Sequence, residues 1–205
     1  VQLGPRMTKT IRYYYNHSSP WTYFGHDRFL ALAEKYDAQI IFRPCESAII
    51  FAQSGGLPVA KRAPQRLANR LVELKRWRDF LGMPMVIESA HKGPAMNWSN
   101  RIAVAHGYRG GDVGAISSAF LKARWAEDRN MSTEAAMIEI VNELGLDGAS
   151  LWAQSQSSDI GSLYDSYTEE AMAANVFGAP TYIFGSELFW GQDRLEFLER
   201  SLAAS

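Results

Sequence analysis

The sequence has a single cysteine, Cys45, among its 205 residues. One thiol excludes a disulfide framework and a Cys-x-x-Cys redox pair, and it is typical of a reducing compartment. The formal net charge of −1 provides no basic field for nucleic acid. No apolar run reaches the roughly 18–20 residues that a membrane span needs. Residues 1–6 precede Met7 and lack the charged-then-apolar order of a signal peptide, so we interpret them as an expression remnant and expect a cytoplasmic protein.

The N-terminal part of the chain alternates between strand and helix signals. Residues 10–15 (TIRYYY) are β-branched and aromatic, which predicts a strand. Pro20 suits the first position of a helix, because its missing N–H is not needed there, and this helix is predicted to end near residue 36. Residues 38–42 (AQIIF) predict a second strand. Strand, helix and strand in this order are typical of a parallel βαβ unit.

A long helical block follows the second strand. Apolar residues recur at three- and four-residue spacing from Leu67 to Leu81, and Gly82 ends this predicted amphipathic helix. Further helices are predicted over residues 98–106, 112–127, 133–144, 147–154 and 167–175.

Strand signals return near the C-terminus. Residues 181–184 and 187–190 flank Gly185-Ser186, which is a hairpin signal, and a last helix is predicted over residues 193–202. The whole order predicts an α/β protein with a thioredoxin-like fold, a mixed four-stranded sheet and a large helical insertion. We place the thioredoxin-like domain at residues 8–45 and 160–205, and the helical insertion at residues 46–159.

The most informative motif is Ser19-Pro20-Trp21-Thr22, between the first predicted strand and its helix. A thioredoxin-type protein carries Cys-x-x-Cys here, whereas both cysteine positions of this chain hold hydroxyls. The first N–H groups of a helix are unpaired and carry about half a positive charge. The Ser19 hydroxyl beside them would stabilise a thiolate from outside, and glutathione is the obvious donor. The alternatives are that Ser19 is only the N-cap of the helix, or that Ser18 takes its role.

Three segments occur in an order and at distances that resemble one known family: Ser19–Tyr23 (SPWTY), Gly178–Tyr182 (GAPTY) and Trp190–Arg194 (WGQDR). Together with Leu71–Met85, they resemble the group of 2-hydroxychromene-2-carboxylate isomerases and kappa-class glutathione transferases, within the DsbA-like thioredoxin superfamily. The resemblance spans nearly all of residues 8–203. It implies a homodimeric, glutathione-dependent cis–trans isomerase of an aromatic or unsaturated carboxylate, in which the thiolate adds reversibly to a conjugated double bond.

The resemblance also implies a glutathione site. Ser19 would contact the sulfur as the catalytic residue, and Ala179, ahead of a cis Pro180, would pair with the peptide backbone. Gln192 and Asp193 would hold the γ-glutamyl end. For Asp193 the alternative, compatible with the first, is the N-cap of the last helix.

The loop after the second strand departs from the family pattern, which often has an Asn there and a Lys further on. Residues 54–58 (SGGLP) contain no Asn, and Arg66 or Lys61 takes the place of the Lys. Arg62 and Arg70 extend this basic stretch, most of which we expect to be a solvated helix face. One or two of these side chains would meet the glycine end of glutathione or a substrate carboxylate.

The sequence evidence for substrate-binding residues is weaker than that for the glutathione site. His17 lies next to the motif, and Trp21 and Trp98 are candidates for an aromatic pocket between the insertion and the core, where pockets are common. The alternative for each is an ordinary loop or core residue. Cys45 is expected to be a small buried residue rather than a reactive thiol. The four histidines show no metal-ligand spacing, so we expect no metal.

Two other functions stay open. A kappa-class-like glutathione transferase or peroxidase would use the same glutathione residues, and only the substrate pocket would distinguish it. A non-catalytic peptide-binding module would keep the groove of the fold without the chemistry, and the missing loop Asn favours it. A disulfide oxidoreductase fits least, because two hydroxyls cannot form a disulfide.

Overall fold

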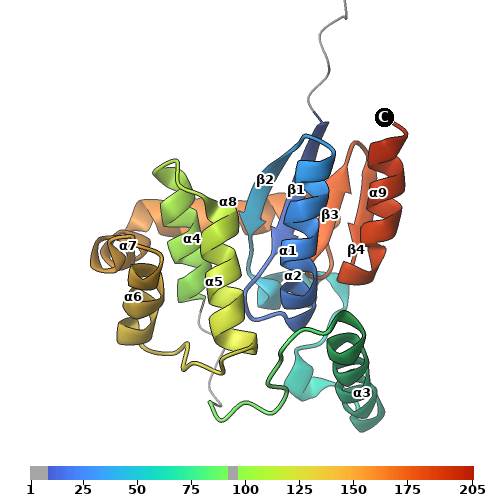
Figure 1. Ribbon diagram of the computed structural model, residues 1–205, viewed down its shortest axis with the longest axis horizontal. Coiled ribbons are helices and arrows are strands. Elements are labelled where there is room, and N and C mark those ends of the chain that lie inside the picture. The colour runs from blue at the N-terminus through green and yellow to red at the C-terminus, as the bar shows by residue number, and fades with distance from the viewer. Residues whose placement is uncertain (1–8, 92–96) are drawn as a thin grey trace, which may run out of the picture.

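A mixed four-stranded sheet lies at the centre of the computed structural model, which describes residues 9–91 and 97–205. The strand order is β2-β1-β3-β4. β1 pairs in parallel with β2, and β3 pairs antiparallel with β4, as the sequence predicts (Figure 1). β3 also pairs antiparallel with β1, which joins the two halves into one mixed sheet. The strands are β1 (Lys9–Tyr15), β2 (Ala38–Pro44), β3 (Thr181–Phe184) and β4 (Glu187–Trp190).

Helices cover both faces of the sheet, because successive side chains of β1 point to opposite sides. α1 (Pro20–Lys35) and α9 (Leu195–Ala203) pack on the face that carries Tyr13 and Tyr15. α2 (Ser47–Ser54) and α8 (Ser158–Ala173) pack on the face that carries Tyr14. β1 is therefore buried on both sides, which explains why its tyrosines are all fully buried.

A second apolar core forms among the helices beside the sheet. These helices are α4 (Trp98–Tyr108), α5 (Val113–Trp125), α6 (Glu134–Glu143) and α7 (Gly148–Ser155). Phe120, Val141 and Leu151 lie at its centre, and Ile160 and Tyr164 of α8 complete it. No helix in residues 9–91 and 97–205 is long and apolar enough to cross a bilayer.

α8 belongs to both cores, since its first half packs on the helical block and its second half on the sheet. The sequence predicts only residues 167–175 of this helix, and that start is wrong. The hydroxyl of Ser157 caps the helix by accepting the Ile160 N–H at 3.4 Å. Gly161 and several serines have poor helix propensity, which the packing of the first half overrides.

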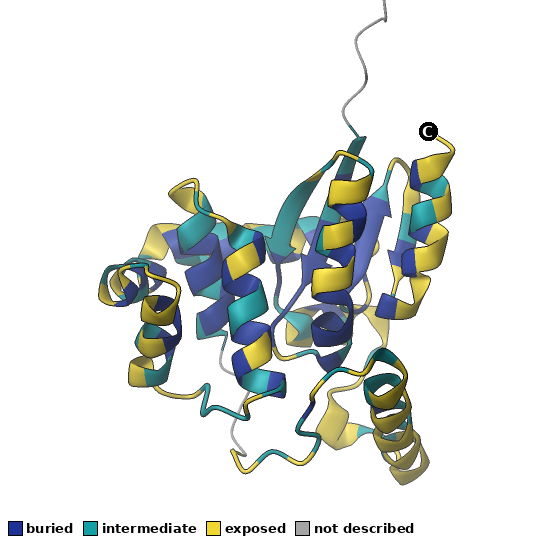
Figure 2. Ribbon diagram, in the orientation of Figure 1, coloured by how far each residue is buried: buried dark blue, intermediate teal, exposed yellow. Residues whose placement is uncertain are grey.

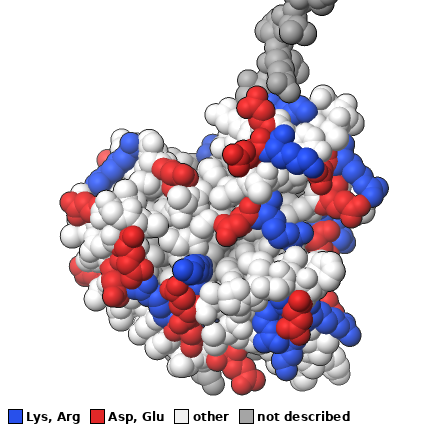
Figure 3. Space-filling view, in the orientation of Figure 1, with Lys and Arg blue, Asp and Glu red and all other residues white. Residues whose placement is uncertain are grey.

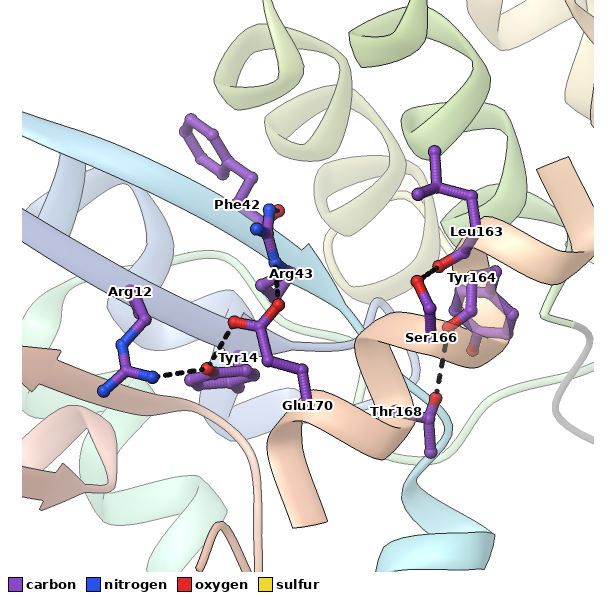
Figure 4. Close-up of polar contacts among 9 residues, drawn as sticks. All are labelled: Arg12, Tyr14, Phe42, Arg43, Leu163, Tyr164, Ser166, Thr168 and Glu170. Carbon is purple, nitrogen blue, oxygen red and sulfur yellow. Dashed lines mark hydrogen bonds and ion pairs between the residues drawn. The ribbon is translucent and has the colours of Figure 1, made fainter. Parts of the chain in front are cut away.

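A charged network fastens α8 to the sheet (Figure 4). Glu170 of α8 accepts hydrogen bonds from Arg43 Nε and from the Tyr14 hydroxyl, both at 2.7 Å. The Arg12 guanidinium lies 3.5 Å from the Tyr14 oxygen. Burial raises the pKa of Glu170, but the hydrogen bonds from Arg43 and Tyr14 together outweigh it and leave the pKa below its usual value. Glu170 is therefore ionised at neutral pH, and it holds α8 against β1 and β2.

α3 (Pro64–Leu81) lies at the edge of the molecule, packs on α1 and is mostly exposed (Figures 1 and 2). It begins three residues before the predicted start, with Pro64 at its first position, and only Leu74 is buried. α2 and the short 3-10 helix η1 (Val59–Lys61) are not among the predicted elements. Neither shows the three- and four-residue apolar spacing on which the helix predictions rest.

Candidate active site

Ser19 lies where the loop after β1 becomes α1. Its backbone is extended, with φ −90° and ψ 119°, and its hydroxyl oxygen accepts the Thr22 N–H at 3.2 Å. The N-cap role of Ser19 and the position of Pro20 at the start of the helix are thus confirmed. The N–H of Trp21 has no hydrogen-bond partner among the described residues, and the first turn carries no acidic side chain. The positive end of the α1 dipole is therefore not neutralised locally.

The loop before β3 meets Ser19 from the far end of the chain. The peptide bond between Ala179 and Pro180 is cis, as the resemblance implies. Ser19 Oγ donates a hydrogen bond to the Ala179 carbonyl oxygen at 3.2 Å. A hydroxyl has one proton and rotates freely to suit its acceptor. Ser19 can therefore redirect that proton to a ligand while its oxygen continues to cap α1.

Gln192 lies in the packing between α1 and the 3-10 helix η2 (Gln192–Arg194). It is 2% exposed, and its side-chain oxygen accepts a hydrogen bond from Arg28 Nη1 at 2.6 Å. A Cβ on Gly25 would lie only 2.8 Å from the Cβ of Gln192, so the approach of α1 needs a glycine there. The fold itself therefore uses the side-chain oxygen that we predict to bind the γ-glutamyl end.

Asp193 is exposed and pairs with Arg194 at 2.8 Å. The prediction that it caps the last helix is wrong. The N-cap of α9 is Arg194, which makes no side-chain cap hydrogen bond, because η2 precedes α9 and places Asp193 inside that turn. The Asp193 carboxylate points back over Gly191, where a Cβ would lie 2.5 Å from Oδ1. It thus remains at the surface, next to the loop of β4.

The basic stretch covers η1 and the beginning of α3. Lys61 ends η1 and Arg66 lies in the first turn of α3, and both side chains are exposed. Trp21, two residues after Ser19, packs in one apolar cluster with Leu74 and Trp77 of α3. This contact brings α3 to the N-terminal end of α1, on which the sequence motif lies.

His17 is buried, although it is adjacent to the motif in the sequence. Its ring lies 5.4 Å from that of Phe120 and 5.7 Å from that of Tyr15, and neither ring nitrogen has a hydrogen-bond partner among the described residues. Burial, with a smaller contribution from His26, lowers the pKa of His17 to about 3. A neutral imidazole that faces the interior supplies no positive charge for a carboxylate at neutral pH.

The two tryptophans predicted to line a substrate pocket belong to different clusters. Trp21 packs with Phe24 between α1 and α3. Trp98 packs on the helical core, 5.5 Å from the ring of Trp152 and 5.5 Å from the Arg101 guanidinium. The structure therefore brings Trp21, but not Trp98, into the apolar cluster next to Ser19.

Cys45 is 1% exposed, which confirms that it is a buried residue. Burial, followed by the nearby Glu46 carboxylate, raises the pKa of its thiol to about 12. The only thiol of the chain is therefore protonated at neutral pH. Among residues 9–91 and 97–205, no group of three His, Cys, Asp or Glu side chains is placed to hold a metal ion.

A polar layer around the Ser19 loop is absent from the sequence-based predictions. Asn16 donates a hydrogen bond to the Ser47 hydroxyl and accepts one from Ser18 at 2.7 Å. Asn97 donates to the Glu46 carboxylate, whose pKa is raised by burial. These contacts join the loops after β1 and β2 to the start of α4. The polar turn at residues 16–19 signals a loop, but nothing local in it identifies the partners.

A cavity of about 640 Å³ lies between α1, α5 and α6, where the insertion meets the core. Tyr23, Ser118, Leu121 and Arg129 are among its lining residues. A pocket is predicted at this junction, but the residues that line this cavity include none of the predicted site residues.

Known proteins share this architecture. A family model described as the DSBA-like thioredoxin domain matches residues 10–203. The 2-hydroxychromene-2-carboxylate isomerase of Pseudomonas putida is 27% identical over 195 residues, which is 94% of this chain and 93% of that one. A solved structure of 2-hydroxychromene-2-carboxylate isomerase superposes with a TM-score of 0.81 and 27% identity, over 95% of each chain. A probable DsbA oxidoreductase from Streptomyces coelicolor shares the fold at 15% identity and a TM-score of 0.75, over 96% of this chain and 89% of that one.

Proposed function

This chain belongs to the family of DSBA-like thioredoxin domains, and we propose that it is a glutathione-dependent isomerase of an aromatic or unsaturated carboxylate. One observation carries the proposal: the Ser19 hydroxyl lies at the uncompensated start of α1, against the Ala179 carbonyl, in a chain whose only thiol is buried. A thioredoxin-like site without its own sulfur requires a thiol from outside. The relatives named 2-hydroxychromene-2-carboxylate isomerase support isomerisation as the reaction.

The donors around Ser19 suit a thiolate. The Ser19 hydroxyl supplies one hydrogen bond, the unpaired N–H of Trp21 supplies a second, and the helix end favours negative charge. Free thiols titrate near pH 8.5, so a drop of about two units in the pKa would make the thiolate dominant at neutral pH. The buried, neutral His17 contributes no charge to this effect, which leaves the helix end and the hydroxyl as its source.

Each end of glutathione would meet a side chain of opposite charge. Asp193 is exposed, and its surface pair with Arg194 is worth only about 0–1 kcal/mol, so an ammonium group can compete for the carboxylate. Arg66 or Lys61 would take the glycine carboxylate, since both are exposed cations. The main chain of Ala179 would pair with the peptide between these ends, as an added strand does.

Bound glutathione would supply the sulfur that adds to a conjugated double bond, allows rotation about it and leaves again, so that no net oxidation occurs. The protein's own part is to bind and orient the reactants and to hold the Ser19 proton close to the sulfur. Ser19 keeps α1 capped throughout, because capping uses its oxygen lone pair and not its proton.

The test compares Ser19→Ala with Ser157→Ala, which removes the equivalent cap of α8. Each change should cost about 1 kcal/mol of stability through the lost cap. Only Ser19→Ala should lower glutathione-dependent turnover of a 2-hydroxychromene-2-carboxylate, by at least about tenfold, because a charge-assisted hydrogen bond is lost. Calorimetry with reduced glutathione, with Asp193→Ala alongside, measures binding directly.

Wild-type rates in Ser19→Ala, or isomerisation without any thiol, would contradict the proposal. Accumulation of a stable glutathione conjugate would identify a transferase instead. A homodimer, implied by the family resemblance, and a cytoplasmic location, expected from the sequence, stay predictions that light scattering and cell fractionation can test.

A further inference from the structure

Arg28 of α1 makes one hydrogen bond among the described residues, and that bond goes to a neutral amide. Its Nη1 donates to Gln192 Oε1 at 2.6 Å, although the two residues are 164 positions apart. The neighbouring acids are engaged elsewhere, since Asp27 accepts the Ser118 hydroxyl and Asp193 pairs with the next residue. The charge of Arg28 is therefore directed at the side chain of Gln192.

Gln192 is connected to the loop that carries Ala179. The N–H of Gly191, immediately before Gln192, donates to the Pro180 carbonyl oxygen at 2.9 Å. The Ala179 carbonyl oxygen in turn accepts the Ser19 hydroxyl at 3.2 Å. Two hydrogen bonds thus join the start of η2, through the cis-proline loop, to the start of α1. They place Gln192 at the candidate active site.

Arg28 decides which end of the Gln192 amide is available to a ligand. A guanidinium has donors only, so the atom that faces it must be the amide oxygen, and the amide nitrogen must face the other way. That nitrogen has no hydrogen-bond partner among the described residues, and it still reaches solvent although Gln192 is only 2% exposed. Gln192 therefore offers an N–H2 donor, which suits a carboxylate and not an ammonium group.

The bond from Arg28 also makes the amide a better donor. Hydrogen bonds that share a group polarise one another, and those that involve a charge are about twice as strong as neutral ones. A guanidinium on the oxygen side of the amide therefore favours an anion on the nitrogen side. Figure 3 shows acidic and basic side chains interspersed over α1 and α9, so no field of one sign attracts an anion to this face. Selection of an anion must rest on the short-range contact.

Resting on the function proposed above, we infer that Arg28 is a positioning residue that makes the glutathione site selective for one end of its thiol. By holding the Gln192 oxygen inward, Arg28 presents the N–H2 group to the α-carboxylate of the γ-glutamyl end. Asp193, the next residue, is then left for the α-ammonium group. The ligand class that follows is thiols with a complete amino acid end, in preference to thiols that lack its carboxylate.

The experiment compares two thiols by calorimetric titration. One is reduced glutathione, and the other is 4-aminobutyryl-cysteinyl-glycine, which lacks only the α-carboxylate of the γ-glutamyl end. The wild type should bind glutathione about tenfold more tightly, because the analogue cannot accept the hydrogen bond from Gln192. The ratio of the two affinities is the preference that Arg28 should control.

Three variants change this contact in different ways. Arg28→Met removes the donor and should lower the preference to about twofold or less, by weakening glutathione and leaving the analogue unchanged. Arg28→Lys can still donate to the amide oxygen and should restore most of the preference. Gln192→Glu should abolish the preference, because an oxygen replaces the outward N–H2 group while the contact with Arg28 is kept.

The matched control is Lys35→Met, which removes a bond of the same length from the other end of α1. Lys35 donates to Glu199 of α9 at 2.6 Å, so its loss also weakens the attachment of α1 to the C-terminal segment. This variant should keep the wild-type preference. Circular dichroism verifies that all forms fold.

A bond that only fastens α1 to η2 would affect both thiols alike. Equal losses of the two thiols in Arg28→Met, or the same loss of preference in Lys35→Met, would therefore overturn the inference and leave the proposed function intact. Wild-type protein that binds neither thiol at millimolar concentration would overturn both. If Arg28→Met loses the preference while Ser19→Ala keeps wild-type turnover, the role of Arg28 stands and the proposed mechanism is wrong.

Discussion

α5 and α3 both pack against α1, and they differ in how much of themselves they bury (Figure 2). α5 buries seven of its 13 residues, whereas α3 buries only Leu74 among 18. Helices in proteins draw most of their stability from packing an apolar face. α5 is therefore held mainly by its buried apolar face. α3 has only one buried residue, so core packing explains little of its sequence.

α5 also makes more polar contacts with the rest of the protein than the beginning of α3 does. Ser117 of α5 is 2.7 Å from the Tyr15 hydroxyl, and the Trp125 indole N–H donates to the His17 carbonyl at 3.0 Å. These bonds hold the end of β1 that leads into Ser19. The cationic groups at the start of α3 meet no carboxylate of the described residues. α5 therefore holds in place the loop that carries Ser19, whereas these cations of α3 take no part in that packing.

The largest effect should come from Phe120→Ala in α5. Phe120 is fully buried in the helical core and contacts the ring of His17. Removing an aromatic side chain from a core costs about 3–5 kcal/mol, so urea unfolding should show a loss of that size in the whole domain. A loss below about 1 kcal/mol would show that α5 contributes no more to the stability of the fold than the exposed helix α3.

A smaller and more local effect is expected for Leu74→Ala, which removes the one buried side chain of α3. The cavity and lost contacts should cost about 2–3 kcal/mol. Because so little else attaches α3, hydrogen exchange should accelerate mainly in residues 64–81 and leave α5 protected. Equal acceleration in both helices would show that α3 is as integral to the fold as α5.

The third prediction uses pH. The unfolded chain protonates His17 near pH 6.5, whereas in the folded protein burial lowers the pKa to about 3. The unfolded state therefore binds the proton first, and this residue makes the protein less stable as the pH falls from about 6.5 toward 3. His17→Phe should remove that penalty and gain about 2 kcal/mol at pH 5 relative to the wild type, but little of this gain at pH 7.5.

Urea unfolding of His17→Phe and the wild type at both pH values measures this difference. Leu74→Ala is the control, because it removes no titrating group, lies outside the ring contacts of His17, and should lower stability equally at pH 5 and pH 7.5. An identical stability change for His17→Phe at the two pH values would refute a neutral, buried His17.

The smallest effect is predicted for Phe80→Ser near the end of α3. Phe80 is 78% exposed and touches Trp77 edge-on. Its loss from the monomer should change the free energy of unfolding by less than about 0.5 kcal/mol. A much larger loss, dependent on protein concentration, would reveal that the exposed side of α3 is covered by a second chain.

Much of the candidate site can be predicted from sequence because its signals are local. The Ser19–Pro20 cap and the Gly185–Ser186 hairpin depend only on neighbouring residues, and their elements appear where predicted. The wrong predictions concern residues whose roles depend on contacts with distant parts of the sequence. Asp193 does not cap α9, and the side-chain oxygen of Gln192 is taken by Arg28 from 164 residues away. No local pattern carries such information.

The sequence by itself determined the order of strands and helices, the hydroxyl at the start of α1 and the lack of an active thiol. Each follows from residue type, period or turn chemistry over a few positions. Only the tertiary structure decided where α8 begins and that His17 is buried and neutral. It also decided that Ser19 meets Ala179 and that Arg28 binds the side-chain oxygen of Gln192. These properties arise from desolvation and from contacts between distant segments, which exist only once the chain has folded.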